Sequence, residues 1–242
     1  MRYLAVVSYE GTNYGGWQIQ PNSISVEEEI EKVLSKILNT PTKIYGSGRT
    51  DKGVHALGQT FHFDAKEILD LGKFKYSLNS LLPNDIHILS LNVVNDDFNA
   101  RFAVKNKTYE YRLNTGEYDL FKRNLECQFL RNLDVNKMKE CLPIFIGEHC
   151  FQNYTSKEDD EDNFIRTIYD FSLSENYGHL VFKITGNGFM RYMVRIIIGS
   201  LIEVGLSHLT KDDLEKALLN KERNVMPYKA SPNGLYLVNV SY

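Results

Sequence analysis

The sequence predicts a layered fold of helices and strands, α+β or α/β, in two halves. Strand-like and helix-like segments alternate along the whole chain, and the alternation restarts near residue 104. Of the 242 residues, 43% are hydrophobic and 24% charged, which is enough to bury a core in one large or two small domains. We therefore divide the chain into residues 1–104 and 105–242.

The first half opens with a strand from Arg2 to Tyr9 and continues with an amphipathic helix. Ser25 begins this helix with a capping box, in which its hydroxyl accepts from the Glu28 amide while Glu28 reaches back. Apolar residues then follow at helical spacing and give the helix one apolar face. They are Val26, Ile30, Val33, Leu34 and Ile37.

Three further strands are expected in the first half. Phe61 and Phe63 alternate with His62, which places His62 on the solvent side of its strand. The expected strands are Thr42 to Tyr45, Gln59 to Asp64 and Ile86 to Val94.

The second half repeats the alternation. Asp134 can cap a short helix that Pro143 ends, and Gly205 stands where a long apolar helix from about Phe189 to Val204 should stop. The remaining expected elements are strands at Tyr109 to Leu113, Ile165 to Leu173, His179 to Ile184 and Leu235 to Val240, and a helix at Thr210 to Leu219.

Composition is typical of a cytoplasmic protein. No apolar run is long enough to span a bilayer, and Met1 leads directly into a strand pattern without a signal peptide. Cys127, Cys141 and Cys150 form no Cys-x-x-Cys pair, which favours free thiols in a reducing compartment. His149 is adjacent to Cys150 rather than at ligand spacing, so we expect no metal site.

The net charge of −3 does not by itself indicate a nucleic-acid partner. A separate acidic run, 157–162, is expected to be a solvated loop. Basic residues gather in one region of the sequence, which is also typical of an ordinary mixed surface. They are Arg101, Lys105, Lys107, Arg112, Lys122 and Arg123.

The most informative segment is the glycine-rich connection 46–56, which carries Arg49 and Asp51. It fails the dinucleotide-binding fingerprint, which needs a glycine where Asp51 stands, and the P-loop, because Val54 and His55 follow its last glycine. The residues alone leave two interpretations open: a turn in which Asp51 caps backbone amides, or a site for chemistry on a rigidly held loop.

Arg195 and Tyr109 also need an explanation. Arg195 lies in an apolar helical stretch, where a cation is stable if it pairs with a carboxylate, bonds backbone carbonyls or reaches solvent. Strand alternation places Tyr109 and Tyr111 on one face, where aromatic residues usually belong to the core.

Several spaced segments, in the same order, resemble the tRNA pseudouridine synthase A family. The resemblance covers nearly the whole chain and is carried by residues 9–18, 48–56, 79–86, 98–102, 107–111, 186–189, 193–195 and 234–237. It implies an α+β pseudouridine synthase fold, in which two similar α/β halves form a largely antiparallel central sheet flanked by helices.

The resemblance also implies roles for four residues. Asp51 matches the catalytic aspartate and Arg195 the arginine that holds it ionised. Tyr109 matches the tyrosine that stacks on the target uracil, and Arg49 the arginine that takes the place of the flipped base. No metal or other cofactor is implied.

The family acts on uridines on the 3′ side of the tRNA anticodon stem-loop, at tRNA positions 38 to 40, generally as a homodimer. Two departures bear on substrate choice: the segment 147–154, and Lys52, where a small residue is common. A synthase for ribosomal RNA or another tRNA position, a non-catalytic RNA-binding protein on the same fold, and a nucleotide-handling enzyme stay open as alternatives.

Overall fold

The structure, a computed structural model, describes residues 1–66, 69–156 and 163–242, so the acidic run 157–162 lies outside the described residues. Its contacts divide the chain into two units. The first unit is Met1–Lys105 with Tyr236–Tyr242, and the second is Asn106–Leu235. The sequence division placed the last strand in the second half, whereas its contacts group residues 236–242 with the first unit.

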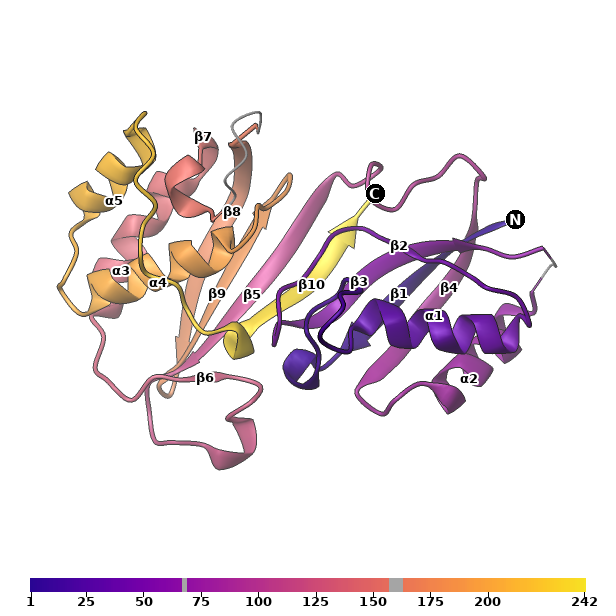
Figure 1. Ribbon diagram of the computed structural model, residues 1–242. Helices are drawn as coiled ribbons and strands as arrows, with labels where there is room; N and C mark the ends of the chain where they lie inside the picture. Colours follow the sequence, from indigo (N-terminus) through magenta and orange to yellow (C-terminus); the bar gives the residue numbers. More distant parts are fainter. Residues whose placement is uncertain (67–68, 157–162) are drawn as a thin grey trace. The chain divides into compact units, whose positions relative to one another are not determined.

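The first unit is built on a mostly antiparallel set of strands (Figure 1). The strand β1 (Arg2–Tyr9) lies between β3 (His55–Asp64) and β4 (Ile86–Val94) and is antiparallel to both. The short β2 (Tyr45–Gly46) is antiparallel to β3, and β10 (Leu235–Ser241) is parallel to it. The strand β3 begins earlier than expected, at His55, because Tyr236 and Leu237 of β10 pair with its first residues.

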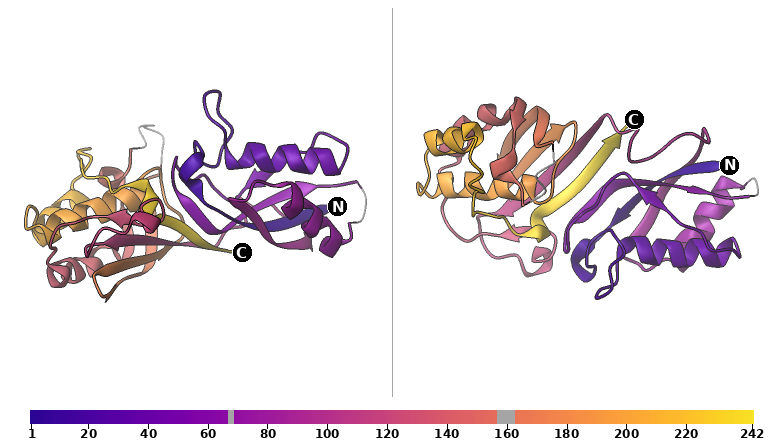
Figure 2. Two further views of the ribbon diagram at one scale, coloured as in Figure 1. Left: turned by 90° about the horizontal axis from the view of Figure 1, so that it is seen from below. Right: turned by 45° about the horizontal axis from the view of Figure 1, so that its top comes forward.

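Two helices pack side by side on this unit (Figures 1 and 2). In α1 (Val26–Ile37), Ser25 caps the amide of Glu28 as predicted. The sequence did not indicate α2 (Leu71–Leu81), whose described side chains bury only Phe74 and Leu78 against the sheet. Its apolar repeat is too short to distinguish from a loop.

His62 corrects the prediction that one face of its strand meets solvent. The side chain is 2% exposed, because Tyr45 stacks on it at 5.0 Å between ring centroids and Phe98 meets it edge-on at 6.4 Å. His62 Nδ1 accepts a hydrogen bond from the Ala100 amide at 3.1 Å. Burial, aided by the nearby charge of Arg2, lowers the pKa of His62 and keeps the ring neutral.

The second unit is also mostly antiparallel. Its strands follow the order β5 (Asn106–Asn114), β9 (His179–Gly186), β8 (Ile165–Asn176) and β7 (Gly147–Cys150), with β6 (Cys127–Gln128) parallel to β5. The helices α3 (Val135–Cys141), α4 (Met193–Gly205) and α5 (Lys211–Leu219) cover one face of these strands (Figure 2). Two units of strands and helices with mainly antiparallel pairing confirm the predicted α+β class.

The helix α4 differs from its prediction at both ends. It starts at Met193 rather than Phe189, because Tyr192 takes a left-handed backbone with φ of 60°. Gly205 is its last residue, and the left-handed residue beyond it is Ser207. A Cβ at Gly205 would lie 2.7 Å from Met138 Sδ, so this glycine permits close packing on α3. In the part of the chain that the structure describes, no helix is long and apolar enough to cross a membrane.

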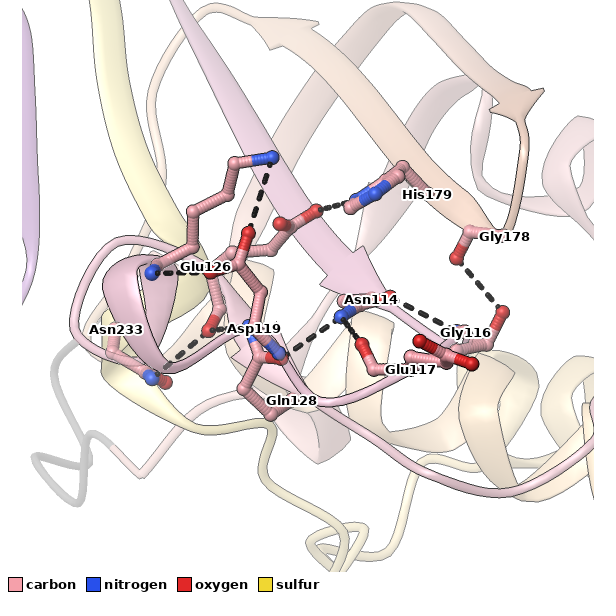
Figure 3. A network of polar contacts seen from close by, with 11 residues as sticks. Asn114, Gly116, Glu117, Asp119, Glu126, Gln128, Gly178, His179 and Asn233 are labelled. Atoms are coloured by element: carbon pink, nitrogen blue, oxygen red, sulfur yellow. Dashed lines mark hydrogen bonds and ion pairs between the residues drawn. The ribbon is translucent and has the colours of Figure 1, made fainter.

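A polar network fixes the loop that follows β5 (Figure 3). Asn114 Nδ2 donates to Gln128 Oε1 at 2.8 Å, and Glu126 Oε1 lies 2.8 Å from His179 Nδ1. The loop therefore has a defined conformation although it exposes 90% of Phe121.

Candidate active site

The connection between β2 and β3 is anchored where it leaves the sheet. The Ser47 amide donates to the Thr60 carbonyl at 2.8 Å, and the Ser47 hydroxyl lies 2.6 Å from Gln59 Oε1. Gln59 Nε2 in turn donates to the Gly48 carbonyl at 2.9 Å. One buried glutamine side chain therefore holds the start of the loop that carries Arg49 and Asp51.

The middle of the loop packs on the segment that follows β1. The Trp17 amide donates to the Thr50 carbonyl at 3.1 Å, and the Tyr9 hydroxyl lies 2.8 Å from Thr50 Oγ1. Gly16 has a φ of 110°, and a Cβ there would lie 2.5 Å from the Thr50 carbonyl oxygen. Glycine is needed at this position both for its backbone conformation and for the close approach.

Asp51 is half-buried, and a tight turn fixes its backbone. The Asp51 carbonyl accepts from the Val54 amide at 3.1 Å, and Gly53 provides the left-handed residue of this turn, with φ of 77°. The first interpretation of the loop, a glycine-rich turn, is therefore correct for its backbone. A carboxylate on a loop anchored on both sides is also well placed for chemistry.

Arg49 is exposed and lies near the start of α1. Its charge acts on Glu27 in the first turn of that helix. Burial raises the pKa of Glu27, whereas the hydrogen bond from the Ile19 amide and the positive charge of Arg49 lower it. Glu27 Oε2 accepts from that Ile19 amide at 2.9 Å. Arg49 is thus exposed to solvent, and its charge acts on the Glu27 carboxylate.

His55 is a residue of this region to which sequence reasoning gave no role. It is buried, its Nδ1 accepts from the Gly11 amide at 3.0 Å, and its ring stacks on Tyr236 at 4.7 Å. An accepting Nδ1 places the proton of a neutral ring on Nε2. His55 therefore fixes the end of the loop through the segment after β1. The sequence signal was its position directly after the loop glycines.

Gly16→Ala is expected to lower both the stability and the activity of the protein. The new Cβ would clash with the Thr50 carbonyl and strain a left-handed backbone, at a cost of about 2 kcal/mol or more. The loop must shift to relieve the clash, and Asp51 moves with it. Thermal unfolding and turnover measure the two effects.

Gly72→Ala is the matched control, because Gly72 lies in the helix α2 and has room for a side chain. The atom nearest to an added Cβ would be Asp70 Oδ1 at 3.5 Å, an ordinary contact distance. Alanine there should leave stability unchanged or slightly higher. If Gly16→Ala has the same melting temperature and the same turnover rate as Gly72→Ala, the close packing of this loop is not important for the site.

Tyr109 lies on β5 in the second unit and is 8% exposed. Its ring meets that of Phe189 edge-on, with centroids 5.3 Å apart. Phe189 belongs to the segment between β9 and α4, so the tyrosine is braced by the chain that leads into the arginine helix. The Tyr109 ring is thus held in one orientation by its aromatic neighbour.

Arg195 lies in the first turn of α4 and is 8% exposed. Its Nε donates to the Ala230 carbonyl at 2.8 Å, and its own carbonyl accepts from the Ala230 amide at 2.9 Å. The guanidinium lies over the Tyr192 ring, with Cζ 5.2 Å from the centroid. Of the three ways in which this cation could be stable, a bond to a backbone carbonyl is present, and exposure to solvent does not explain its stability.

The Arg195 charge also acts on the strand that carries Tyr109. Burial raises the pKa of Tyr111, and Arg195 opposes this shift. The Tyr111 hydroxyl donates to the Ser231 carbonyl at 3.0 Å. Of the four residues singled out in the sequence, Arg49 and Asp51 share one loop of the first unit, and Tyr109 and Arg195 both belong to the second.

Comparison with known proteins identifies the family. The family model described as tRNA pseudouridine synthase matches residues 5–103 and 143–242. The chain is 41% identical to a tRNA pseudouridine synthase A of Listeria monocytogenes serotype 4b, over all of this chain and 99% of that protein. It is 39% identical to the protein of that name from Limosilactobacillus reuteri and 37% identical to that from Exiguobacterium sibiricum, over all of this chain and 96% of each relative. The chain belongs to the tRNA pseudouridine synthase family.

Proposed function

We propose that this protein isomerises uridine to pseudouridine in tRNA, at the 3′ side of the anticodon stem-loop, with Asp51 as the catalytic carboxylate. The observation that supports this most strongly is the whole-length relationship to enzymes named tRNA pseudouridine synthase A. The rigid glycine-containing loop that holds Asp51 supports the choice of this residue.

The reaction exchanges one bond of the uracil for another. The bond between N1 and the ribose C1′ breaks, the ring turns, and C5 bonds to C1′. The hydrogen on C5 leaves to solvent and N1 takes up a proton, so no other reactant is consumed. A paired base is out of reach of side chains, and the nucleotide must therefore be flipped into the site.

In this proposal Asp51 acts either as a nucleophile or as a base that takes a ribose proton and gives a glycal-like intermediate. Arg195 keeps Asp51 ionised and fixes its direction. Tyr109 stacks on the detached uracil and keeps it in place while it turns. Arg49 occupies the gap that the flipped base leaves, because a guanidinium can stack on bases and bind phosphate.

As the family resemblance implies, the proposed enzyme is a homodimer that binds one tRNA across its two subunits, in the cytoplasm. Light scattering of the purified protein tests the dimer. A synthase for ribosomal RNA or for another tRNA position is the second candidate, favoured by Lys52 and by the departures in segment 147–154.

The test is tritium release from transcripts made with uridine tritiated at C5, because forming the C5 bond expels that hydrogen. Release from whole tRNA, with the modified positions mapped to the anticodon stem-loop, is the expected result. Release only from ribosomal RNA, or from tRNA at other positions, would replace the substrate. No release from either RNA, with tRNA still bound, would favour the non-catalytic binder.

A further inference from the structure

Three cations surround one aromatic ring at the start of α4. The Lys229 Nζ lies 4.2 Å from the centroid of the Tyr192 ring, and the guanidinium carbons of Arg191 and Arg195 lie at 4.9 and 5.2 Å. Arg191 also donates to the Tyr192 hydroxyl at 3.2 Å. The ring face offsets part of the repulsion among these charges.

The backbone around this ring adds to the positive potential. Tyr192 is the N-cap of a 13-residue helix, yet its side chain makes no capping bond, and the first turn contains no acidic residue. Helix N-termini carry a partial positive charge and normally attract carboxylates. Here they meet cations instead. An anion close to this end would offset the charges of the three side chains and the partial charge of the helix.

The lysine reaches the ring because the segment that carries it approaches the helix closely. A Cβ at Gly199 would lie 2.6 Å from the Tyr228 carbonyl oxygen and 2.9 Å from the Lys229 nitrogen. The two hydrogen bonds between Arg195 and Ala230 hold the same segment against α4. The backbone of Lys229 is therefore held next to α4 by the packing of the fold, and its side chain starts from a fixed position.

Arg191 and Lys229 are exposed, and within residues 1–66, 69–156 and 163–242 neither forms an ion pair with a carboxylate. Arg112, by comparison, lies 3.2 Å from Glu110. The positive charges and hydrogen-bond donors of Arg191 and Lys229 are therefore available for a ligand. Arg191 stands four residues before Arg195 in the chain.

We infer that Arg191 and Lys229 form a binding subsite for one phosphodiester of the RNA substrate, at the N-terminus of α4. The inference rests on the proposed function, because it takes RNA as the ligand. The cation pair grips the backbone beside the nucleotide on which the enzyme acts, and both side chains lie against the Tyr192 ring. Arg195 keeps the role proposed for it above and is not part of the subsite.

The first test measures tRNA affinity at several salt concentrations for the wild type, Arg191→Gln and Lys229→Gln. Each lost phosphate contact should reduce the slope of log affinity against log salt by about 0.7–0.9. Lys139→Gln is the matched control: it removes one exposed charge from α3, in the same unit, and should leave the slope unchanged. Thermal unfolding confirms that all three variants fold.

The second test locates the phosphate. Anticodon stem-loop RNAs that carry one neutral methylphosphonate each are bound to the wild type and to Lys229→Gln. At one position the wild type should lose affinity and the variant should not, because the same contact is already missing. Unchanged salt slopes in both subsite variants, with no methylphosphonate position that distinguishes them from the wild type, would overturn the subsite.

These measurements are independent of turnover. If the protein binds tRNA with the expected slopes but releases no tritium, the subsite stands and the proposed reaction fails. If tritium is released while the slopes of both variants equal that of the wild type, the reaction stands and the subsite fails. Competition by inorganic phosphate without any methylphosphonate effect would identify a site for free anions only, and would also contradict the inference.

Discussion

Asp51→Asn is expected to abolish pseudouridine formation while tRNA binding stays close to that of the wild type. The amide keeps the size and shape of the carboxylate but can neither attack carbon nor accept a proton at neutral pH. Loss of such a group costs about 10²–10⁴-fold in rate. Single-turnover tritium release gives the rate, and filter binding with the same tRNA gives the affinity.

Asp96→Asn is the control, because it removes the same charge from an exposed position of the first unit. It should turn over like the wild type. Normal tritium release by Asp51→Asn would remove this residue from the reaction. Loss of both rate and binding would instead assign the Asp51 side chain a role in holding the loop.

The sequence predicted the fold best where a periodic pattern coincided with a chemical boundary signal. The strands β1 and β4 have the bounds that alternation gave them, and α5 begins directly after Thr210, whose capping box with Asp213 is present. Asp134 caps α3 through the Lys137 amide, and Pro143 follows its end. Helix caps and strand alternation depend on residues close together in the chain, so they can be predicted from the sequence alone.

The errors arose where distant residues decide the outcome. His62 alternates with two phenylalanines, but Tyr45 and Phe98 cover the face that should have met solvent. The start of α4 is displaced by the left-handed Tyr192, which no propensity favours. The partner of β10 could not be read from the sequence either, because a parallel neighbour is chosen by topology rather than by local pattern.

The candidate site shows the same division. Glycines indicated a tight loop at 46–56, and the apolar neighbours of Arg195 indicated that this cation needs a partner. Periodicity gave no role to Tyr109 among 15 tyrosines, and only the resemblance singled it out. The stacking of His55 on Tyr236 joins residues far apart in the chain, and the bond from Gln59 to Gly48 depends on how the loop between them is folded. Both therefore appear only in the structure.

Arg195→Ala is expected to lower both stability and activity. Truncation removes the hydrogen bond from Nε to the Ala230 carbonyl, leaves that buried acceptor unsatisfied and opens a cavity beside Tyr192. Together with the loss of the proposed pairing to Asp51, these changes should cost about 3 kcal/mol. For a chain of this length that corresponds to a fall in melting temperature of roughly 5–10 °C.

Two further variants separate packing from charge. Arg195→Lys retains the cation but loses the planar fork, so it should recover part of the stability and little of the rate. A cycle of Arg195→Lys with Asp51→Asn measures the proposed pairing directly, because residues that act together lose less in combination than the sum of their separate losses. Strict additivity would contradict the pairing. A melting temperature and rate of Arg195→Ala equal to those of the wild type would go further, since a buried cation that can be deleted without effect holds neither the helix nor a carboxylate.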